Sequence, residues 1–180
     1  MYLGELDTGW ELQFKGAGKT PFSRSADGRK VLRSSIREFL MSEHMHALGV
    51  PTTRALSVVT SGTMIERDQF YDGRARLERA TVIVRAAPTF LRFGSFEIFR
   101  GRDEHTGREG PSHGLEGEML PRMIDFVCRT YFPAEVRAAD PGDGVIVAVF
   151  RSIVGRTARL CAHWQSIGWC HGVLNTDNMR

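Results

Sequence analysis

The chain has 180 residues, of which 42% are hydrophobic and 25% charged, and its formal net charge is +3 at pH 7. These values are typical of a soluble globular protein with a core of its own, and the mild, scattered charge argues against a dedicated nucleic-acid binder. No apolar run is long enough to span a membrane, and three cysteines without CxxC spacing argue against a disulfide framework and favour a reducing compartment.

The first half of the chain predicts strands and one helix. Residues 2–6 and 10–15 alternate apolar and polar side chains around an Asp-Thr-Gly turn, which predicts a β-hairpin. After a glycine-rich loop, an apolar stripe predicts a helix from about Lys30 to Leu48. Residues 53–60 and 80–86 are rich in Val, Ile and Thr, so we expect two further strands there.

The second half predicts helices. A polar loop covers residues 100–117, and a helix is expected from Glu118 to Tyr131, interrupted near Pro121. A longer helix is expected from Val145 to Ile167, with Gly168 as its stop.

This order of elements indicates an α+β, protein-kinase-like fold. A β-rich N-lobe with one key helix would occupy residues 1–100, followed by a polar loop and helix over residues 101–144. The start of an α-helical C-lobe, with a catalytic-type loop, would occupy residues 145–180. The strand-like first residues and the loop-like last residues predict that this fold is truncated at both ends.

The segment GAGKT, residues 16–20, resembles part of a phosphate-binding P-loop. That motif requires a glycine where this chain has Gln13. A glycine-rich turn after a strand is therefore favoured.

Lys15 and Glu38 are a more informative pair. Lys15 ends an expected strand, and Glu38 lies in the middle of the following helix. In kinase-like folds a strand lysine contacts nucleotide phosphates and a helix glutamate holds it, because a flexible point charge needs an anionic partner. The alternative is a surface lysine and a solvated glutamate.

Two arginines and one turn are further candidates. Arg85 and Arg92 flank a short segment before a glycine, and arginines near a glycine turn can clamp phosphate; they could equally form structural ion pairs. Asp27-Gly28 could line a site or simply form a turn.

The chain closes with HGVLNTDNMR, residues 171–180. The histidines and cysteines show no zinc spacing, whereas Asp and Asn oxygens favour magnesium with phosphates. Many small-molecule kinases carry H-G-D-x-x-x-x-N, whose Asp is the base. Here Val173 occupies the position of that base, and valine cannot accept a proton. Asp177 is the one carboxylate in the loop.

Three stretches closely resemble the selenoprotein O family of kinase-like protein adenylyltransferases: WELQFKGAGKTPFSRSADGRKVLRSSIREFLMSEHMHALGVPTTRAL, TVIVRAAPTFLRFGSFEIF and HGVLNTDNM. The resemblance implies ATP bound in a flipped orientation, Mg²⁺, and transfer of AMP to Ser, Thr or Tyr hydroxyls of proteins. It implies a mitochondrial location in a eukaryote and a cytoplasmic one in a bacterium. It suggests neither nucleic acid nor a membrane as partner, and oligomeric state and protein substrates stay open.

The resemblance also implies residue roles. The residues that would contact ATP or its phosphates are Lys15, Asp27, Gly28, Arg85 and Arg92. Glu38 would hold Lys15, Asp177 would be the base and Asn178 would bind Mg²⁺.

Two departures from the family pattern concern the ends of the chain. A GQLGDGRA-type segment before MYLGE is absent, as is a DYGPFGF-type segment with a second metal-binding Asp after NTDNM. We therefore expect an internal piece with weak magnesium binding and little transfer activity alone. The alternatives are a non-catalytic nucleotide-binding pseudokinase module and an ordinary phosphotransferase.

Overall fold

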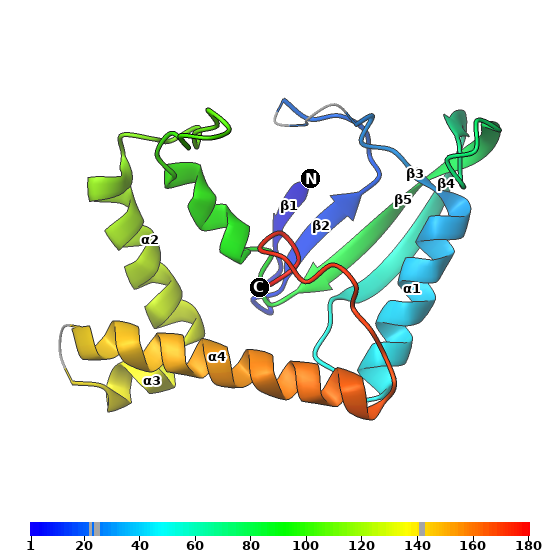
Figure 1. The fold of residues 1–180 in the computed structure, drawn as a ribbon. Coiled ribbons are helices and arrows are strands. Elements are labelled where there is room, and N and C mark those ends of the chain that lie inside the picture. Colours follow the sequence, from blue (N-terminus) through cyan, green and yellow to red (C-terminus); the bar gives the residue numbers. More distant parts are fainter. Residues whose placement is uncertain (22, 24–25, 141–142) are drawn as a thin grey trace. The chain divides into compact units, whose positions relative to one another are not determined.

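A computed structural model describes residues 1–21, 23, 26–140 and 143–180 (Figure 1). The chain divides into two compact units, unit 1 from Met1 to Phe90 and unit 2 from Leu91 to Arg180, and each is described by itself. Part of the expected glycine-rich loop (Phe22, Arg24 and Ser25) lies outside the described residues. The three-part division expected from the sequence stays a prediction.

Unit 1 is built on an antiparallel sheet of five strands. These are β1 (Tyr2–Glu5), β2 (Glu11–Lys15), β3 (Lys30–Val31), β4 (Arg54–Arg67) and β5 (Arg76–Ala87). Strand β5 is central: β4 pairs along one of its edges, and β2 and then β3 pair along the other. The predicted β1–β2 hairpin is confirmed.

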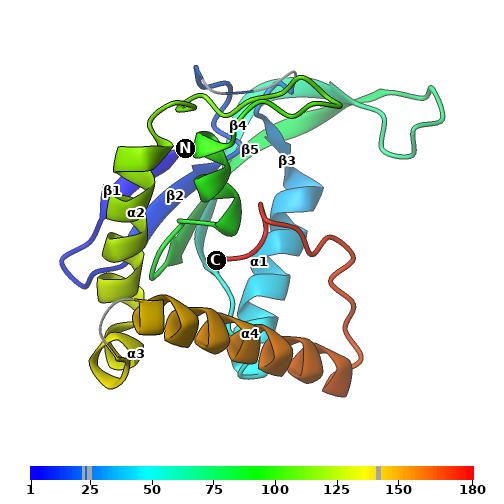
Figure 2. The ribbon, with the colours of Figure 1, turned by 60° about the vertical axis from the view of Figure 1, so that its left-hand side comes forward.

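Helix α1 (Leu32–Ala47) packs against β4 and β5 (Figures 1 and 2). The prediction that this helix begins at Lys30 is wrong by two residues. Lys30 and the buried Val31 pair with β5 in extended conformation, because a β-branched residue at the sheet edge gains ladder hydrogen bonds and burial there.

Strands β4 and β5 are longer than the sequence predicts. Beyond residue 60, the polar and glycine-containing stretch continues to pair with β5 as far as Arg67↔Arg76. Figure 2 shows this end of the hairpin projecting beyond the rest of the sheet. Backbone pairing extends the two strands past the Val-, Ile- and Thr-rich runs into a stretch of mixed polar and apolar residues, so the sequence pattern underestimates their length.

Unit 2 is helical. It contains the 3₁₀ helix η1 (Phe93–Phe99), α2 (Glu116–Tyr131), α3 (Pro133–Ala138) and α4 (Asp143–Ser166). The interruption expected near Pro121 is wrong, since α2 runs through it. The proline lies in the second turn, where it removes a single backbone hydrogen bond.

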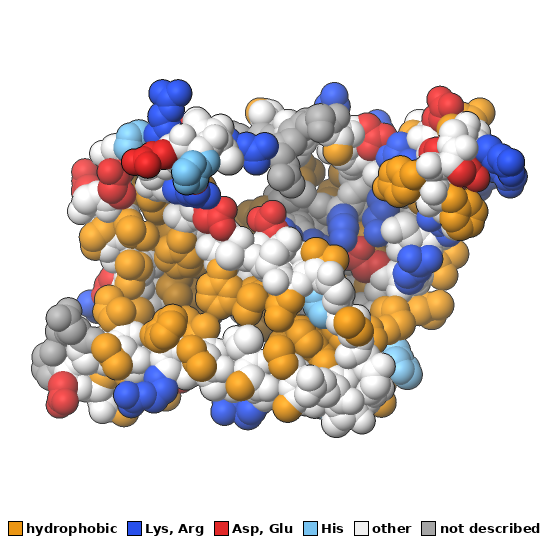
Figure 3. All heavy atoms as spheres, viewed as in Figure 1, with side chains coloured by type: hydrophobic (Ala, Val, Ile, Leu, Met, Phe, Trp, Pro, Cys, Tyr) orange, Lys and Arg blue, Asp and Glu red, His pale blue; other side chains and the backbone are white. Residues whose placement is uncertain are grey.

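The helices α2, α3 and α4 share a small core, in which Cys128, Phe132 and Val149 are buried. Many large apolar side chains of the same helices stay exposed, and Figure 3 shows them gathered over α2 and α4. They include Met119, Phe126, Ile146, Val147, Phe150 and Val154. None of the helices that the structure describes is both long and apolar enough to cross a membrane. The mixed α+β class expected from the sequence is confirmed.

Candidate functional site

Strand register places three cationic side chains of unit 1 on one face of the sheet. Lys15, the last residue of β2, pairs with Ile83, and Lys30, the first residue of β3, pairs with Thr81. Residues directly opposite in an antiparallel pair share a face, and so do alternate residues of one strand. Thr81, Ile83 and Arg85 alternate along β5, so Lys15, Lys30 and Arg85 project from the same face.

Helix α1 covers this face and brings a carboxylate to it. The hydroxyls of Ser35 and Thr81 share a buried hydrogen bond of 2.6 Å, which fixes the helix on the sheet. Glu38 follows Ser35 by three residues and therefore lies on the same side of the helix. The expected strand lysine and helix glutamate are thus joined: Lys15 Nζ lies 2.9 Å from Glu38 Oε2.

Glu38 binds two further cations. Lys30 Nζ lies 3.0 Å from the same Oε2 atom, and Arg85 Nη1 donates to Oε1 at 3.2 Å. We call Lys15, Lys30 and Arg85, together with Glu38, the cation cluster. Three cations around one carboxylate leave a surplus of two positive charges, which is the pattern expected of a site for a polyanion.

The charges of the cation cluster shift its ionisation. Burial opposes the ionised form of Glu38, but the charge of Lys15 and hydrogen bonds from Lys15 and Lys30 outweigh it, so the pKa of Glu38 falls to about 2. Partial burial and the positive charges of Arg85 and Lys30 lower the pKa of Lys15, although Glu38 opposes that shift. The neighbouring cations thus stabilise the Glu38 carboxylate, whereas burial is the main reason that the Lys15 ammonium is disfavoured.

Arg85 is held on several sides. Its guanidinium also donates to the side chain of Gln13, its opposite neighbour on β2, and lies over the Phe90 ring at 5.5 Å. Such packing fixes the direction of an arginine and preserves its charge. Gln13, which speaks against a P-loop in the sequence, therefore has a role as a partner of Arg85.

Asp27 and Gly28 lie at the C-terminal end of the glycine-rich loop. Asp27 accepts from the Arg29 backbone N–H at 2.9 Å and from Arg67 Nη2 at 2.7 Å, and these bonds lower its pKa. Gly28 has φ +68°, and a Cβ there would lie 2.2 Å from the Gly18 carbonyl oxygen. The structure thus joins both residues to the base of the loop, outside the contacts of the cation cluster.

The segment GAGKT precedes a strand, whereas a P-loop opens a helix. Lys19 is exposed, and Thr20 hydrogen-bonds Ser23 in a local turn. The glycine-rich turn favoured by the sequence fits this geometry.

In unit 2, η1 forms hydrogen bonds with the terminal loop, residues 171–180. Phe93 N–H donates to Met179 O at 3.1 Å and Gly94 N–H donates to Thr176 O at 2.9 Å. Thr176 Oγ1 donates to Glu97 Oε1 at 2.7 Å. A Cβ on Gly94 would lie 2.9 Å from Asp177 Oδ1, so the candidate base lies directly against this glycine.

Asp177 and Asn178 are exposed. Asn178 Nδ2 donates to Val173 O at 3.0 Å and to Asn175 Oδ1 at 2.8 Å. The side-chain oxygen of Asn178, Oδ1, is therefore the atom that could bind a cation. Carboxylate and carboxamide oxygens suit Mg²⁺, which takes further ligands from phosphates and water. Within the described ranges, no group of three or more His, Cys, Asp or Glu side chains is placed to hold a metal.

Aromatic contacts fix the start of the terminal loop. The His171 ring lies 5.1 Å from Trp164, at the end of α4, and 5.5 Å from Trp169. His171 Nδ1 accepts from the Val173 N–H at 3.1 Å, so the neutral ring carries its proton on Nε2.

Arg92 lies in unit 2 as the N-cap residue of η1, where its backbone N–H donates to Ser95 Oγ at 3.0 Å. The predicted residues therefore fall into two groups. Lys15, Asp27, Gly28, Glu38 and Arg85 belong to unit 1, and Arg92, Asp177 and Asn178 belong to unit 2.

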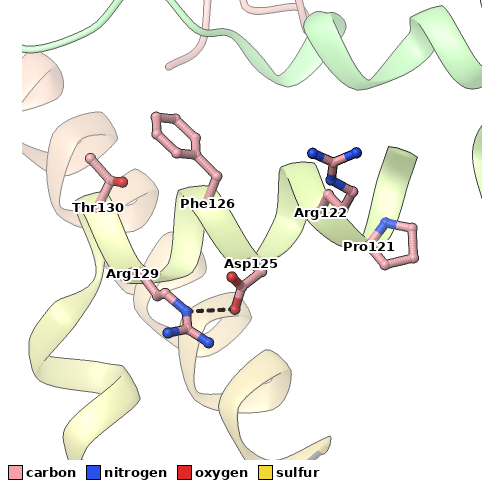
Figure 4. A pocket seen from close by; sticks show the side chains of 6 residues that line it. All are labelled: Pro121, Arg122, Asp125, Phe126, Arg129 and Thr130. Carbon is pink, nitrogen blue, oxygen red and sulfur yellow. Dashed lines mark hydrogen bonds and ion pairs between the residues drawn. The ribbon is translucent and has the colours of Figure 1, made fainter. Parts of the chain in front are cut away.

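A pocket runs along α2, and no predicted site residue lines it (Figure 4). Its lining includes Phe126 and the Asp125–Arg129 ion pair, whose atoms lie 2.7 Å apart. An exposed pair of this kind on one helix contributes little binding energy, so this pocket is a weaker candidate than the cation cluster.

Sequence reasoning missed Lys30 and the Thr176–Glu97 contact. The sequence places Lys30 inside a helix. Once β3 is recognised as a strand, Lys30 pairs with Thr81 of β5, two residues from Ile83, which pairs with Lys15. Helix η1, which carries Glu97, has its own signal: Phe93, Phe96 and Phe99 recur every three residues, the period of a 3₁₀ helix.

Comparison with known proteins identifies the relatives of this chain. The family model described as "Protein adenylyltransferase SelO" matches residues 3–180. A human protein named "Protein adenylyltransferase SelO, mitochondrial" is 58% identical over 99% of this chain and 27% of its own length. A zebrafish protein, "Protein adenylyltransferase SelO-1, mitochondrial", is 58% identical over 98% of this chain and 26% of its own.

Bacterial relatives are also similar. A Nitrosospira multiformis protein named "Protein nucleotidyltransferase YdiU" is 49% identical over 98% of this chain and 30% of its own length. The chain spans about a quarter to a third of the length of these curated relatives. Since the family model covers nearly all of its residues, the chain belongs to the SelO family of protein adenylyltransferases.

Proposed function

We propose that this chain forms the ATP-binding part of a protein adenylyltransferase, which transfers AMP to Ser, Thr or Tyr hydroxyls of proteins. The observation that carries the proposal is the cation cluster, in which three cations surround Glu38 with two positive charges in surplus. A triphosphate supplies the negative charge that this arrangement lacks. Lys15 and Arg85 would contact phosphate oxygens, and Glu38 would hold these cations near the phosphate site.

A kinase-like division into lobes suits this function. Unit 1, with its sheet and one covering helix, would be the N-lobe, and unit 2 would begin the helical C-lobe. The Lys15–Glu38 contact supports this assignment, because kinase-like N-lobes position their phosphate lysine by a helix glutamate. Asp27 and Gly28 would contribute to the nucleotide site through the glycine-rich loop, and Arg92 would meet phosphate from unit 2.

The reaction would join the acceptor oxygen to the α-phosphorus of ATP. The bond between that phosphorus and the β-phosphate bridging oxygen breaks, pyrophosphate leaves, and the hydroxyl proton passes to Asp177. The cation cluster would offset the charge of the phosphates. Mg²⁺, when bound, would add to that charge stabilisation, and Asn178 would offer it a side-chain oxygen.

An ordinary phosphotransferase is the weaker reading of the same site. Val173 occupies the position of the kinase base and cannot accept a proton. Transfer of AMP presents a different phosphorus to the acceptor, so the carboxylate of Asp177 could serve instead.

Calorimetry with ATP tests the nucleotide site in this chain. We expect Lys15→Met to weaken ATP binding by about tenfold or more, since a phosphate contact of a half-exposed cation is lost. Lys19→Met is the matched control, because it removes the same charge from an exposed residue outside the cation cluster. Equal ATP affinity of Lys15→Met and the unaltered chain would contradict the proposed site.

The direction of transfer is tested with ATP labelled separately at the α- and γ-phosphates. We expect any label that reaches the acceptor protein to be the α-label and not the γ-label, and we expect this transfer to be lost in Asp177→Asn. Retained γ-label would support phosphorylation instead. Because the chain spans only part of its relatives' length, we expect the 180 residues alone to bind ATP but to transfer little AMP.

The names of the relatives suggest where such a protein works. The human and zebrafish relatives are called mitochondrial. We propose a mitochondrial location for this protein if its source is a eukaryote and a cytoplasmic one if it is a bacterium, with proteins as its substrates.

A further inference from the structure

We propose that Lys30 is the resident ion-pair partner of Glu38, and that it frees Lys15 to bind phosphate. Lys30 would thus be a positioning residue, and Lys15 the lysine that moves onto the ligand. The proposal rests on the nucleotide-binding function of the cation cluster proposed above. It assigns different tasks to two lysines that contact the same carboxylate oxygen.

The two lysines differ in how firmly they are held. The Lys30 side chain is 12% exposed, and its Nζ donates to Ser34 Oγ at 2.8 Å as well as pairing with Glu38. The Lys15 side chain is 46% exposed. A long side chain loses conformational entropy when it is fixed. The mostly covered Lys30, held by two partners, has already lost that entropy, whereas the half-exposed Lys15 retains more of it.

The backbone holds Lys30 in place. Lys30 lies in β3 opposite Thr81, beside the buried Val31. Ser34 follows four residues later in the first turn of α1, so the lysine and its hydroxyl partner belong to one short strand-to-helix segment. Movement of Lys30 away from Glu38 would therefore break contacts that Lys15 does not have.

Competition for one oxygen explains why both lysines are needed. Lys15 and Lys30 lie 2.9 and 3.0 Å from Glu38 Oε2. When Lys15 turns to a phosphate, Lys30 and Arg85 still neutralise Glu38. Without Lys30, the departure of Lys15 would leave a partly buried carboxylate with Arg85 alone, which raises the free energy of that movement.

The lysine content of the chain makes the test direct. Its lysines are Lys15, Lys19 and Lys30, so selective ¹³C,¹⁵N-lysine labelling gives three side-chain signals, assigned by single substitutions. We expect ATP and tripolyphosphate to shift the Lys15 Nζ signal strongly and to leave the Lys30 signal nearly unchanged. Slow hydrogen exchange at Lys30 Nζ and fast exchange at Lys15 Nζ are expected without ligand.

Substituting each lysine in turn distinguishes the effect of its position from the effect of its charge alone. We expect Lys30→Met to weaken tripolyphosphate binding by about tenfold and Lys19→Met by less than about twofold. Lys30→Met should also raise the pKa of Lys15, because a positive neighbour is lost and Lys15 then holds Glu38 alone on that oxygen. We further expect the shift that tripolyphosphate causes in the Lys15 Nζ signal to shrink in Lys30→Met, whereas a merely structural role of Lys30 would leave that shift unchanged.

A second variant keeps the test valid if Lys30→Met unfolds. Ser34→Ala retains every charge and removes one anchor of Lys30, so we expect faster Lys30 exchange and about two- to threefold weaker tripolyphosphate binding. The proposal is overturned if the ligand shifts Lys30 rather than Lys15, or if both variants bind as the unaltered chain does. Failure of the unaltered chain to bind either ligand would instead overturn the nucleotide site, and this proposal with it.

Discussion

The cation cluster of unit 1 and the terminal loop of unit 2 hold their functional side chains by different means. In unit 1, strand register and a covering helix place Lys15, Lys30 and Arg85 around a partly buried Glu38. In unit 2, exposed Asp177 belongs to a loop held mainly by backbone hydrogen bonds to the segment that begins with η1. In the first arrangement, the ion pairs form only when the sheet and helix are folded. In the second, the position of the Asp177 side chain depends on the local backbone of the loop. Substitutions should therefore change stability in unit 1 and loop geometry in unit 2.

The largest effect is expected at Glu38. Glu38→Gln removes the one carboxylate that separates three cations, and we expect the free energy of unfolding of unit 1 to fall by about 3 kcal/mol. Urea unfolding followed by β5 amide signals measures this. Glu66→Gln on β4 is a control that removes a carboxylate from the same sheet, outside the cation cluster. Similar losses in the two variants would contradict a special role of Glu38.

The Glu38 carboxylate also makes the stability of unit 1 depend on pH in the acid range. The pKa of Glu38 is about 2 in the folded chain and 4.5 ordinarily, so the unfolded chain takes up this proton first as the pH falls. The stabilisation is complete above pH 4.5 and is lost progressively toward pH 2. We expect the stability difference between the unaltered chain and Glu38→Gln to shrink over this range, and a constant difference would show that Glu38 does not titrate this way.

A smaller loss is expected at Gly28. Gly28→Ala combines a positive φ with a Cβ at 2.2 Å from the Gly18 oxygen, so we expect the free energy of unfolding to fall by about 2 kcal/mol. Gly73→Ala is a matched control, because Gly73 has φ +80° with no atom within 4 Å of its Cβ. Gly73→Ala should cost about 1 kcal/mol, from backbone strain alone. Equal losses would mean that the close approach at Gly28 relaxes freely.

In unit 2, Thr176→Val should act locally. It removes the hydrogen bond to Glu97, so we expect the terminal loop to open more easily by about 1 kcal/mol. Hydrogen exchange of the Gly94 amide, which donates to Thr176 O, measures this opening. Thr106→Val, in another loop of unit 2, is the control. Unchanged exchange at Gly94 would show that the backbone bonds hold the loop without the threonine hydroxyl.

The smallest change in stability is expected for Gly94→Ala. The added Cβ meets Asp177 Oδ1 at 2.9 Å and the Thr176 carbonyl oxygen at 3.3 Å. The carboxylate can rotate away and the Thr176 backbone must shift only slightly, so we expect a cost of about 0.5 kcal/mol. We nevertheless expect a clear change in the Asp177 side-chain NMR signal. Gly117→Ala, whose Cβ would meet no atom within 4 Å, should leave that signal unchanged.

The sequence predicted the elements with strong periodicity and the Lys15–Glu38 pair. The hairpin and the three long helices follow from apolar patterns, and Glu38 was found because a kinase-like fold needs a partner for its strand lysine. Lys30 was missed because a two-residue strand has no period of its own. Its identity as a strand depends on pairing with residues fifty positions later.

Predictions failed where backbone interactions determine the structure. The far ends of β4 and β5 lack a clear strand pattern, yet they pair, and α2 tolerates Pro121 near its start. The contact between Thr176 and Glu97 joins side chains 79 residues apart in sequence, and no local pattern relates them. Such long-range contacts follow from the tertiary fold rather than from the residues nearby.

The distribution of lysine has a consequence for covalent labelling and modification. All three lysines of the chain lie between residues 15 and 30, whereas unit 2 carries its positive charge on arginine. Acylating or cross-linking reagents that target primary amines would therefore react, beyond the N-terminus, only with the glycine-rich loop and its two flanking strand ends. Each reaction at Lys15 or Lys30 removes a charge from the cation cluster, so the extent of acylation with and without ATP would report directly on occupancy of this one region.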